Sequence, residues 1–244
     1  MRKSIKRGIA IAAASAMALS IVSVTSVFNS NAAGVTRDIT NMARRTNLSV
    51  DMSGDLVITR DDLADKSMGK EDSSTMFVYM CGSDLESYYG LANMDLREMI
   101  AANESENVNI VIQTGGARTW RGNGISNSQI GRYVVKGDKL QLVESQPQAN
   151  MGKASTLESF LEWGIENYAA EHMSLVLWNH GGGSISGVCF DERNSYDSLS
   201  LSEVEIALAN ASKNMTDKFD FIGFDACLMA TMEVANILNK YSDK

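Results

Sequence analysis

The stretch SLVLWNHGGG, Ser174 to Gly183, decides the architecture of this chain. A short apolar run of strand composition ends abruptly in an asparagine, a histidine and three glycines. A strand that ends in this way brings a titratable side chain to the end of a sheet, with nothing bulky after it. The histidine, His180, is one of two in the whole chain. We therefore treat it as a candidate functional residue, against the plainer interpretation of a histidine packed in a glycine-rich turn.

Apolar runs of the same kind alternate with amphipathic segments from Thr75 onward. Strands are predicted at TMFVYM, NVNIVIQTGG, MSLVLW and FDFIGF, and a hairpin at GRYVVKGDKLQLVE with its turn at 136–139. Ser-x-x-Glu capping boxes predict three helix starts, at Ser83/Glu86, Ser155/Glu158 and Ser200/Glu203, and LMATMEVANILNKY predicts a last helix. This alternation predicts an α/β fold with a mainly parallel sheet. In such sheets, functional residues gather at the carboxyl ends of the strands.

The amino-terminal residues indicate export. The first seven residues, MRKSIKR, are basic, and residues 8–28 are mostly apolar or small. The sequence SNAAG that follows soon after offers a signal-peptidase cleavage site after Ala32. We predict a signal peptide over 1–32, with an uncleaved anchor as the alternative, and hence a secreted or cell-surface protein without stable membrane association after cleavage. Residues 33–74 are polar, and we expect a poorly ordered leader or pro-segment with short structure at DLVIT. The main folded domain is predicted over 75–244.

Net charge and cysteine content limit the classes of ligand and partner that the sequence is expected to bind. Removing 1–32 takes four basic residues and no acidic one from totals of 22 and 30, so the net charge becomes 18 − 30 = −12. This charge argues against a nucleic-acid partner, which requires clustered cations. Three cysteines, Cys81, Cys189 and Cys227, leave at least one thiol unpaired, and their spacing matches no zinc pattern. We therefore hypothesise that one of the three cysteines is a free thiol with a chemical role.

Cys227 supplies that thiol. It follows the strand FIGFDA and is expected at or near a helix N-terminus, where the helix dipole favours a thiolate. His180 stands at the equivalent place on another strand, 227 − 180 = 47 residues upstream. Caspases carry their histidine about 50 residues before the cysteine. The pair predicts a cysteine nucleophile with a histidine acid–base partner, and the Gly181 N–H would face the developing oxyanion.

The motifs WNHGGG, GFDACLMATMEVA and FVYMCGSDLES together resemble the clostripain family of cysteine peptidases, from the clan of caspases, gingipains and legumains. The resemblance covers about Thr75 to Asn239. It implies a caspase-like three-layer αβα sandwich, a Cys227–His180 dyad and cleavage of polypeptides after arginine or lysine. It also associates Asp225, in D-A-C, with the pocket for the basic P1 residue; the alternative is an aspartate bonded to nearby backbone.

The resemblance carries three further expectations. Relatives are often cut between the two motifs, and the polar stretch DERNSYDS makes Arg193 the first expected self-cleavage site, with Lys213 or Lys218 second. Relatives usually continue past this point with further strands, so the sheet is expected to be incomplete, and activity of these 244 residues alone is left open. Some relatives depend on calcium; no EF-hand-like loop occurs, and no cofactor is required by the sequence.

Three other functions remain as alternatives. A secreted binding module that keeps the peptidase fold but lacks activity is the main one. HGGG also occurs in esterases of the α/β-hydrolase fold, but no G-x-S-x-G nucleophile follows His180. A metal hydrolase using His180, Asp191 and Asp225 lacks a second nearby histidine.

Overall fold

The computed structural model describes residues 46–50, 56–60, 69, 71–103 and 105–244. A hairpin of β1 (Thr46–Val50) and β2 (Leu56–Arg60) belongs to one compact unit, and the candidate residues belong to another, which includes 67–244. β2 confirms the short structure expected at DLVIT, whereas its partner β1 was not anticipated. The predicted signal peptide lies outside the described residues. Across the described ranges, no helix has the length and apolar character needed to cross a membrane.

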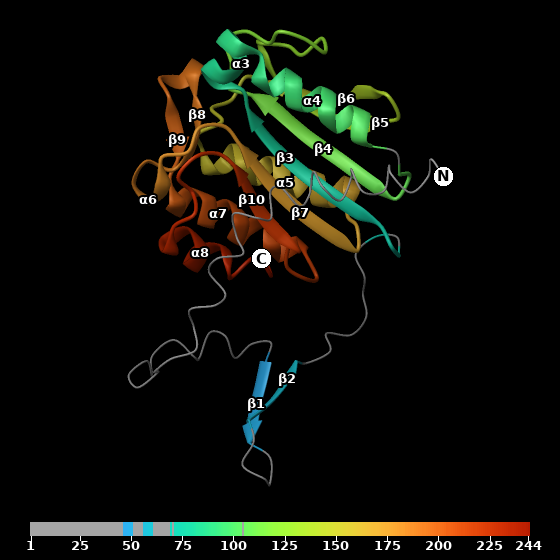
Figure 1. Ribbon diagram of the computed structural model, residues 1–244, viewed down its shortest axis with the longest axis vertical. Helices are drawn as coiled ribbons and strands as arrows, with labels where there is room; N and C mark the ends of the chain where they lie inside the picture. Colours follow the sequence, from blue (N-terminus) through green and yellow to red (C-terminus); the bar gives the residue numbers. More distant parts are fainter. Residues whose placement is uncertain (1–45, 51–55, 61–68, 70, 104) are drawn as a thin grey trace, which may run out of the picture. The chain divides into compact units, whose positions relative to one another are not determined.

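A six-stranded sheet forms the centre of the larger unit, in the order β10-β7-β3-β4-β5-β6 (Figure 1). The first four strands in this order run parallel, and the β5–β6 hairpin adds antiparallel strands at one edge, as the sequence predicted. β10 is the opposite edge. The strand bounds are β3 (Ser74–Cys81), β4 (Val108–Gly115), β5 (Gln129–Lys136), β6 (Lys139–Pro147), β7 (His172–Trp178) and β10 (Phe221–Asp225).

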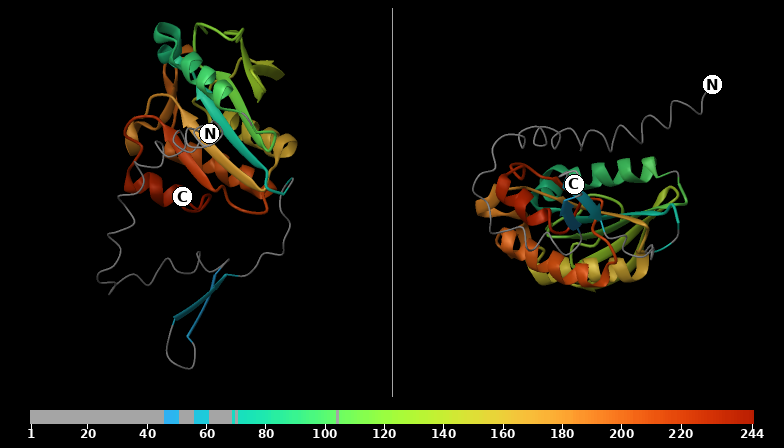
Figure 2. Two further views of the ribbon diagram at one scale, coloured as in Figure 1. Left: turned by 45° about the vertical axis from the view of Figure 1, so that its right-hand side comes forward. Right: turned by 90° about the horizontal axis from the view of Figure 1, so that it is seen from below.

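Helices cover both faces of this sheet, which Figure 2 shows from below. β3 separates the two cores by alternation, since successive strand side chains point to opposite faces. Phe77 and Tyr79 belong to one buried cluster with residues of three helices, whereas Val78 and Met80 belong to a second cluster with α4. The helices of the first cluster are α5 (Ala154–Tyr168), α7 (Leu201–Ala211) and α8 (Met232–Leu238). The three-layer α/β arrangement predicted from the sequence is therefore confirmed.

The helix starts follow the sequence in one case of three. Ser200 and Glu203 form the predicted capping box at α7. Glu86 instead accepts hydrogen bonds from the backbone of Asn93 and Arg121, and a left-handed Gly90 divides the predicted helix into α3 (Ser83–Tyr89) and α4 (Leu91–Ala102). The start of α5 at Ala154 likewise has no side-chain cap. The predictions of capping boxes at Ser83/Glu86 and Ser155/Glu158 were therefore wrong. At the first of them, backbone groups from elsewhere in the fold occupy the Glu86 carboxylate.

The connection from β7 to α7 contains small elements beside the carboxyl ends of the strands. In chain order they are α6 (Gly183–Ser186), β8 (Val188–Asp191), the 3₁₀ turn η1 (Glu192–Asn194) and β9 (Asp197–Leu199). β8 and β9 pair antiparallel as a separate two-stranded sheet. A second 3₁₀ turn, η2 (Ser212–Asn214), follows α7.

Candidate active site

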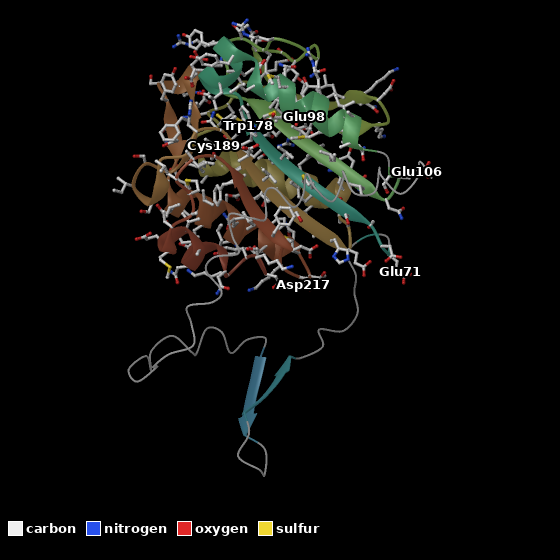
Figure 3. All side chains as sticks on the ribbon, viewed as in Figure 1. Glu71, Glu98, Glu106, Trp178, Cys189 and Asp217 are labelled. Atoms are coloured by element: carbon white, nitrogen blue, oxygen red, sulfur yellow. The ribbon has the colours of Figure 1, made fainter. Side chains whose placement is uncertain are left out.

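His180 and Cys227 leave the sheet at the same level. β7 and β10 are parallel neighbours, and their register pairs Trp178 with Asp225. His180 lies two residues beyond Trp178, and Cys227 lies two residues beyond Asp225. Figure 3 labels Trp178 at this end of the sheet. The parallel register therefore brings the two residues, 47 apart in sequence (227 − 180), to adjacent positions at the carboxyl edge.

Gly181 packs directly against the nucleophile loop. A Cβ at this position would lie 2.0 Å from the Cys227 carbonyl oxygen, so no larger residue fits there. Gly181 and Val188 form an isolated antiparallel β-bridge. Its two hydrogen bonds are donated by the Cys189 N–H to the His180 carbonyl and by the Gly182 N–H to the Gly187 carbonyl. Neither bond uses the Gly181 N–H. The oxyanion role predicted for this N–H stays a prediction.

The expected position of Cys227 at a helix N-terminus was wrong. α8 begins at Met232 with Thr231 as its N-cap, so Cys227 lies in the loop between β10 and that helix. A helix dipole acts within about its first turn, and it therefore gives little help to a thiolate here. Cys227 is nevertheless the exposed thiol, whereas Cys81 and Cys189 are buried and burial raises the pKa of both. Exposure and the adjacent His180, rather than a helix, define Cys227 as the candidate nucleophile.

Asn179 ties the strand ends together. Its buried amide donates from Nδ2 to the Cys81 carbonyl at 2.6 Å and accepts from the Phe190 N–H at 2.7 Å, while its own N–H donates to the Asp225 carbonyl at 3.2 Å. One side chain and its backbone thus join β3, β8 and β10 next to His180. The sequence analysis gave Asn179 no role, although its place in WNHGGG was visible.

Asp84 is a second residue that the sequence analysis did not assign. Its Oδ1 lies 2.9 Å from His180 Nε2. Burial would raise the pKa of this carboxyl, but hydrogen bonds from His180 and Ser83 and the charge of His180 lower it overall. Its FVYMCGSDLES context suggested only the start of a helix. The contact spans 96 residues of sequence, which no local pattern reveals.

A pocket of about 320 Å³ opens at this place, lined by Asp84, His180, Gly181, Phe190 and Tyr196. Strained backbone surrounds it. Ser83, Cys189, Tyr196 and Leu228 have φ values between 51° and 62°, in the left-handed region that non-glycine residues rarely adopt. Such strain collects at functional sites, because the surrounding structure must hold it in place. A larger hollow of about 550 Å³ beside α4 and the β5–β6 turn contains none of the candidate residues.

Asp225 ends β10 beside a second carboxylate. The indole Nε1 of Trp178 donates to Asp95 Oδ2 at 2.7 Å, and it also bonds to Asp225. Desolvation raises the pKa of Asp225. Desolvation also raises the pKa of Asp95, and the negative charge of Asp225 raises it further. Neither carboxyl has a lysine or arginine within ion-pair distance among the described residues.

The remaining predicted residues lie elsewhere. Arg193 is exposed but sits in η1, where the Asp191 carboxylate accepts from the N–H groups of Arg193 and Asn194 at 2.8 and 3.1 Å. Asp191 is fully buried and also accepts from the Met151 N–H, so its oxygens hold this turn rather than face His180. Within the described ranges, no group of three His, Cys, Asp or Glu side chains is arranged to hold a metal ion.

A mostly parallel sheet with a histidine and an exposed cysteine at adjacent strand ends provides the two groups that nucleophilic catalysis by a thiol requires. Comparison with known proteins gives the family. The clostripain family model matches residues 78–244, well over half of the sequence, and the chain belongs to this family. Clostripain of Hathewaya histolytica is 26% identical over 203 residues, a match covering 70% of this chain and 37% of that protein.

Solved structures show the same fold. A secreted C11 cysteine protease from Bacteroides thetaiotaomicron, in complex with an irreversible peptide inhibitor, superposes with a TM-score of 0.57 at 23% identity, over 70% of this chain and 47% of that one. An inactive zymogen C11 protease from Parabacteroides distasonis gives a TM-score of 0.50 at 25% identity, over 70% and 46%. The chain thus spans about half or less of the length of these relatives.

Proposed function

We propose that this chain carries the catalytic centre of an exported cysteine endopeptidase that cleaves after arginine or lysine. The observation that carries the proposal is the parallel register of β7 and β10, which sets His180 and Cys227 two residues beyond one Trp178–Asp225 pair. Membership of a peptidase family supports polypeptides as the substrate class.

The chemistry follows from these groups. A nitrogen of His180 takes the thiol proton of Cys227, and the sulfur bonds to the scissile carbonyl carbon. The carbonyl oxygen becomes an oxyanion, which the Gly181 N–H stabilises. His180 returns the proton to the departing amine as the C–N bond breaks. Water then attacks the thioester, gives a proton to His180, and releases the acid and the thiol.

Specificity is assigned to the acidic end of β10. Asp225 ends β10 two residues before Cys227 in the sequence, and its carboxyl has no cationic partner among the described side chains within 4 Å. A guanidinium or ammonium group placed there would stabilise a carboxylate that desolvation otherwise disfavours. We therefore assign Asp225 to the P1 pocket.

Export and processing complete the proposal. We propose cleavage after Ala32, a leader over 33–74, and self-processing at Arg193 with Lys213 or Lys218 as secondary sites. Arg193 and Lys213 are exposed, but both lie in 3₁₀ turns, so cleavage requires local opening of η1 or η2. Calcium is assigned no chemical step, and its effect is tested by adding calcium or a chelator to the processing assay.

The decisive experiment labels the full chain with a thiol-reactive, arginine-based probe and follows hydrolysis of an arginyl peptide. Wild-type protein and Cys189→Ala are expected to be labelled and active, because Cys189 is buried away from substrate. Cys227→Ala and His180→Ala are expected to lose turnover while keeping their circular dichroism. Folded wild-type protein without labelling or turnover would instead favour a binding module that has kept the peptidase fold.

A further inference from the structure

We propose that Asp84 is a positioning residue that fixes the tautomer and orientation of His180, so that three side chains rather than two carry the reaction. The inference rests on the proposed function, because it assigns Asp84 a role through the candidate acid–base residue. Asp84 touches neither the nucleophile nor the substrate in this scheme.

Sheet topology aligns the three residues. β10, β7 and β3 are adjacent in that order, and Met80, Trp178 and Asp225 share one level across them. Cys227 and His180 lie two residues past this level, and Asp84 lies four past it. Since β7 runs between the other two strands, His180 follows the middle strand, Cys227 follows one neighbouring strand and Asp84 follows the other.

The contact determines which ring nitrogen carries the proton. Asp84 Oδ1 lies 2.9 Å from His180 Nε2, and an ionised carboxylate only accepts hydrogen bonds. The neutral imidazole therefore holds its proton on Nε2, and Nδ1 is left with the lone pair that a general base requires. Without this bond, the ring would exchange tautomers and rotate about its side-chain torsions.

The local backbone is built to direct the carboxylate. Ser83 is fully buried with φ 51°, a strained conformation that turns the chain between β3 and α3, and its hydroxyl donates to Asp84 Oδ1 at 3.0 Å. The Asp84 side chain is 26% exposed, so the pair is partly shielded from water. The residue at the N-cap of α3 is Gly82, which has no side chain to cap the helix.

The charged and titratable groups around the pair are few in the described part of the chain. Cys81 ends β3 and Tyr196 lines the pocket; desolvation raises the pKa of both, and the charge of Asp84 adds to each shift. Glu192 and Tyr88 also raise the pKa of Tyr196, and the positive charge of Arg118 lowers it. Arg118 is the cation nearby: its Nε lies 3.8 Å from Glu192 Oε1, whereas the ion pair of Asp84 within the described residues is with His180.

The chain provides a matched control. Its other histidine, His172, makes a similar contact at the opposite end of the sheet, from Nδ1 to Asp220 Oδ2 at 3.0 Å. Asp220→Asn and Asp84→Asn therefore each remove the carboxylate from one histidine–aspartate pair. Only Asp84→Asn affects the candidate acid–base residue, His180. Asp84→Glu tests whether a carboxylate alone restores the function.

The test combines hydrolysis kinetics with an NMR measurement of the His180 tautomer. In Asp84→Asn, an amide N–H can face the ring, and we expect kcat for an arginyl peptide to fall about 100-fold or more, with KM within about threefold. Asp84→Glu should recover part of the activity, and Asp220→Asn should match wild type. Long-range ¹H–¹⁵N spectra, in which only two histidines appear, should show Nε2–H for His180 in wild type and a mixture in Asp84→Asn.

Each outcome decides the matter. Unchanged kcat and tautomer in folded Asp84→Asn, or an equal loss in Asp220→Asn, would overturn the inference. Loss of melting temperature with no change of tautomer would make Asp84 a structural helix-start residue and would also overturn it. A wild-type chain without turnover whose Nε2–H tautomer depends on Asp84 would refute the proposed function and support the positioning role.

Discussion

Asp225→Asn tests the specificity assignment most directly. Asparagine keeps the shape of the side chain and an oxygen that accepts from the Trp178 indole, and it removes the charge. Losing one partner of a desolvated charge pair costs roughly 2–5 kcal/mol. At about 1.4 kcal/mol per decade this is on the order of 30-fold to several thousand-fold in kcat/KM. Because Asp225 is exposed before substrate binds, we expect the lower end, about 30- to 300-fold.

Stability should respond in the opposite sense. Desolvation raises the pKa of Asp225 in the folded chain. A carboxyl with a raised folded pKa favours the fold while it is protonated, and this contribution is lost as pH rises above its unfolded pKa. At neutral pH the ionised group therefore opposes folding slightly, and Asp225→Asn should leave the melting temperature unchanged or slightly higher. Turnover of arginyl substrates should fall as pH drops through the raised pKa, since protonation removes the attraction for the P1 cation.

The assay compares arginyl-peptide hydrolysis with alkylation of Cys227 by iodoacetamide. The control is Asp220→Asn, which removes a carboxylate just before the other end of β10. If Asp225 binds the P1 side chain, turnover falls and alkylation is preserved. A parallel loss of turnover and alkylation, together with a lower melting temperature, would refute the pocket and make Asp225 a brace for the nucleophile loop.

Four further predictions follow from the same geometry. In native protein, a disulfide reagent should modify one thiol, Cys227, and all three after denaturation; rapid native modification of a second would contradict the burial of the others. Gly181→Ala should abolish turnover, because its Cβ would overlap the Cys227 carbonyl, whereas Gly223→Ala, whose nearest contact is 3.7 Å, should not. Asn179→Ala leaves a buried carbonyl and N–H unpaired and should cost about 2–4 kcal/mol in a denaturant titration; a loss below about 1 kcal/mol would disprove its tying role. Mass spectrometry should find cleavage after Arg193 in wild type and none there in Arg193→Ala; an unchanged fragment pattern would move the site elsewhere.

Much of the fold could be predicted from the sequence, because its signals are local. The apolar runs fixed the six strands of the sheet and the β5–β6 turn, and the Ser200–Glu203 capping box fixed the start of α7. Local signals failed where distant groups competed for the same atoms. Glu86 is satisfied by Asn93 and Arg121 and not by a cap, and Gly90 interrupts a helix whose apolar pattern continued through it.

The candidate pair was also visible in the sequence, because residues that follow strands of one parallel sheet must meet at its carboxyl edge. His180 and Cys227 needed no more than this rule. What the tertiary structure alone decided was the register between strands and the partners it creates: Asp84 beside His180, Asn179 joining three strand ends, and Cys227 in a loop rather than at the start of α8. Register depends on packing across both faces of the sheet, and contacts across 96 residues leave no periodic trace in the chain.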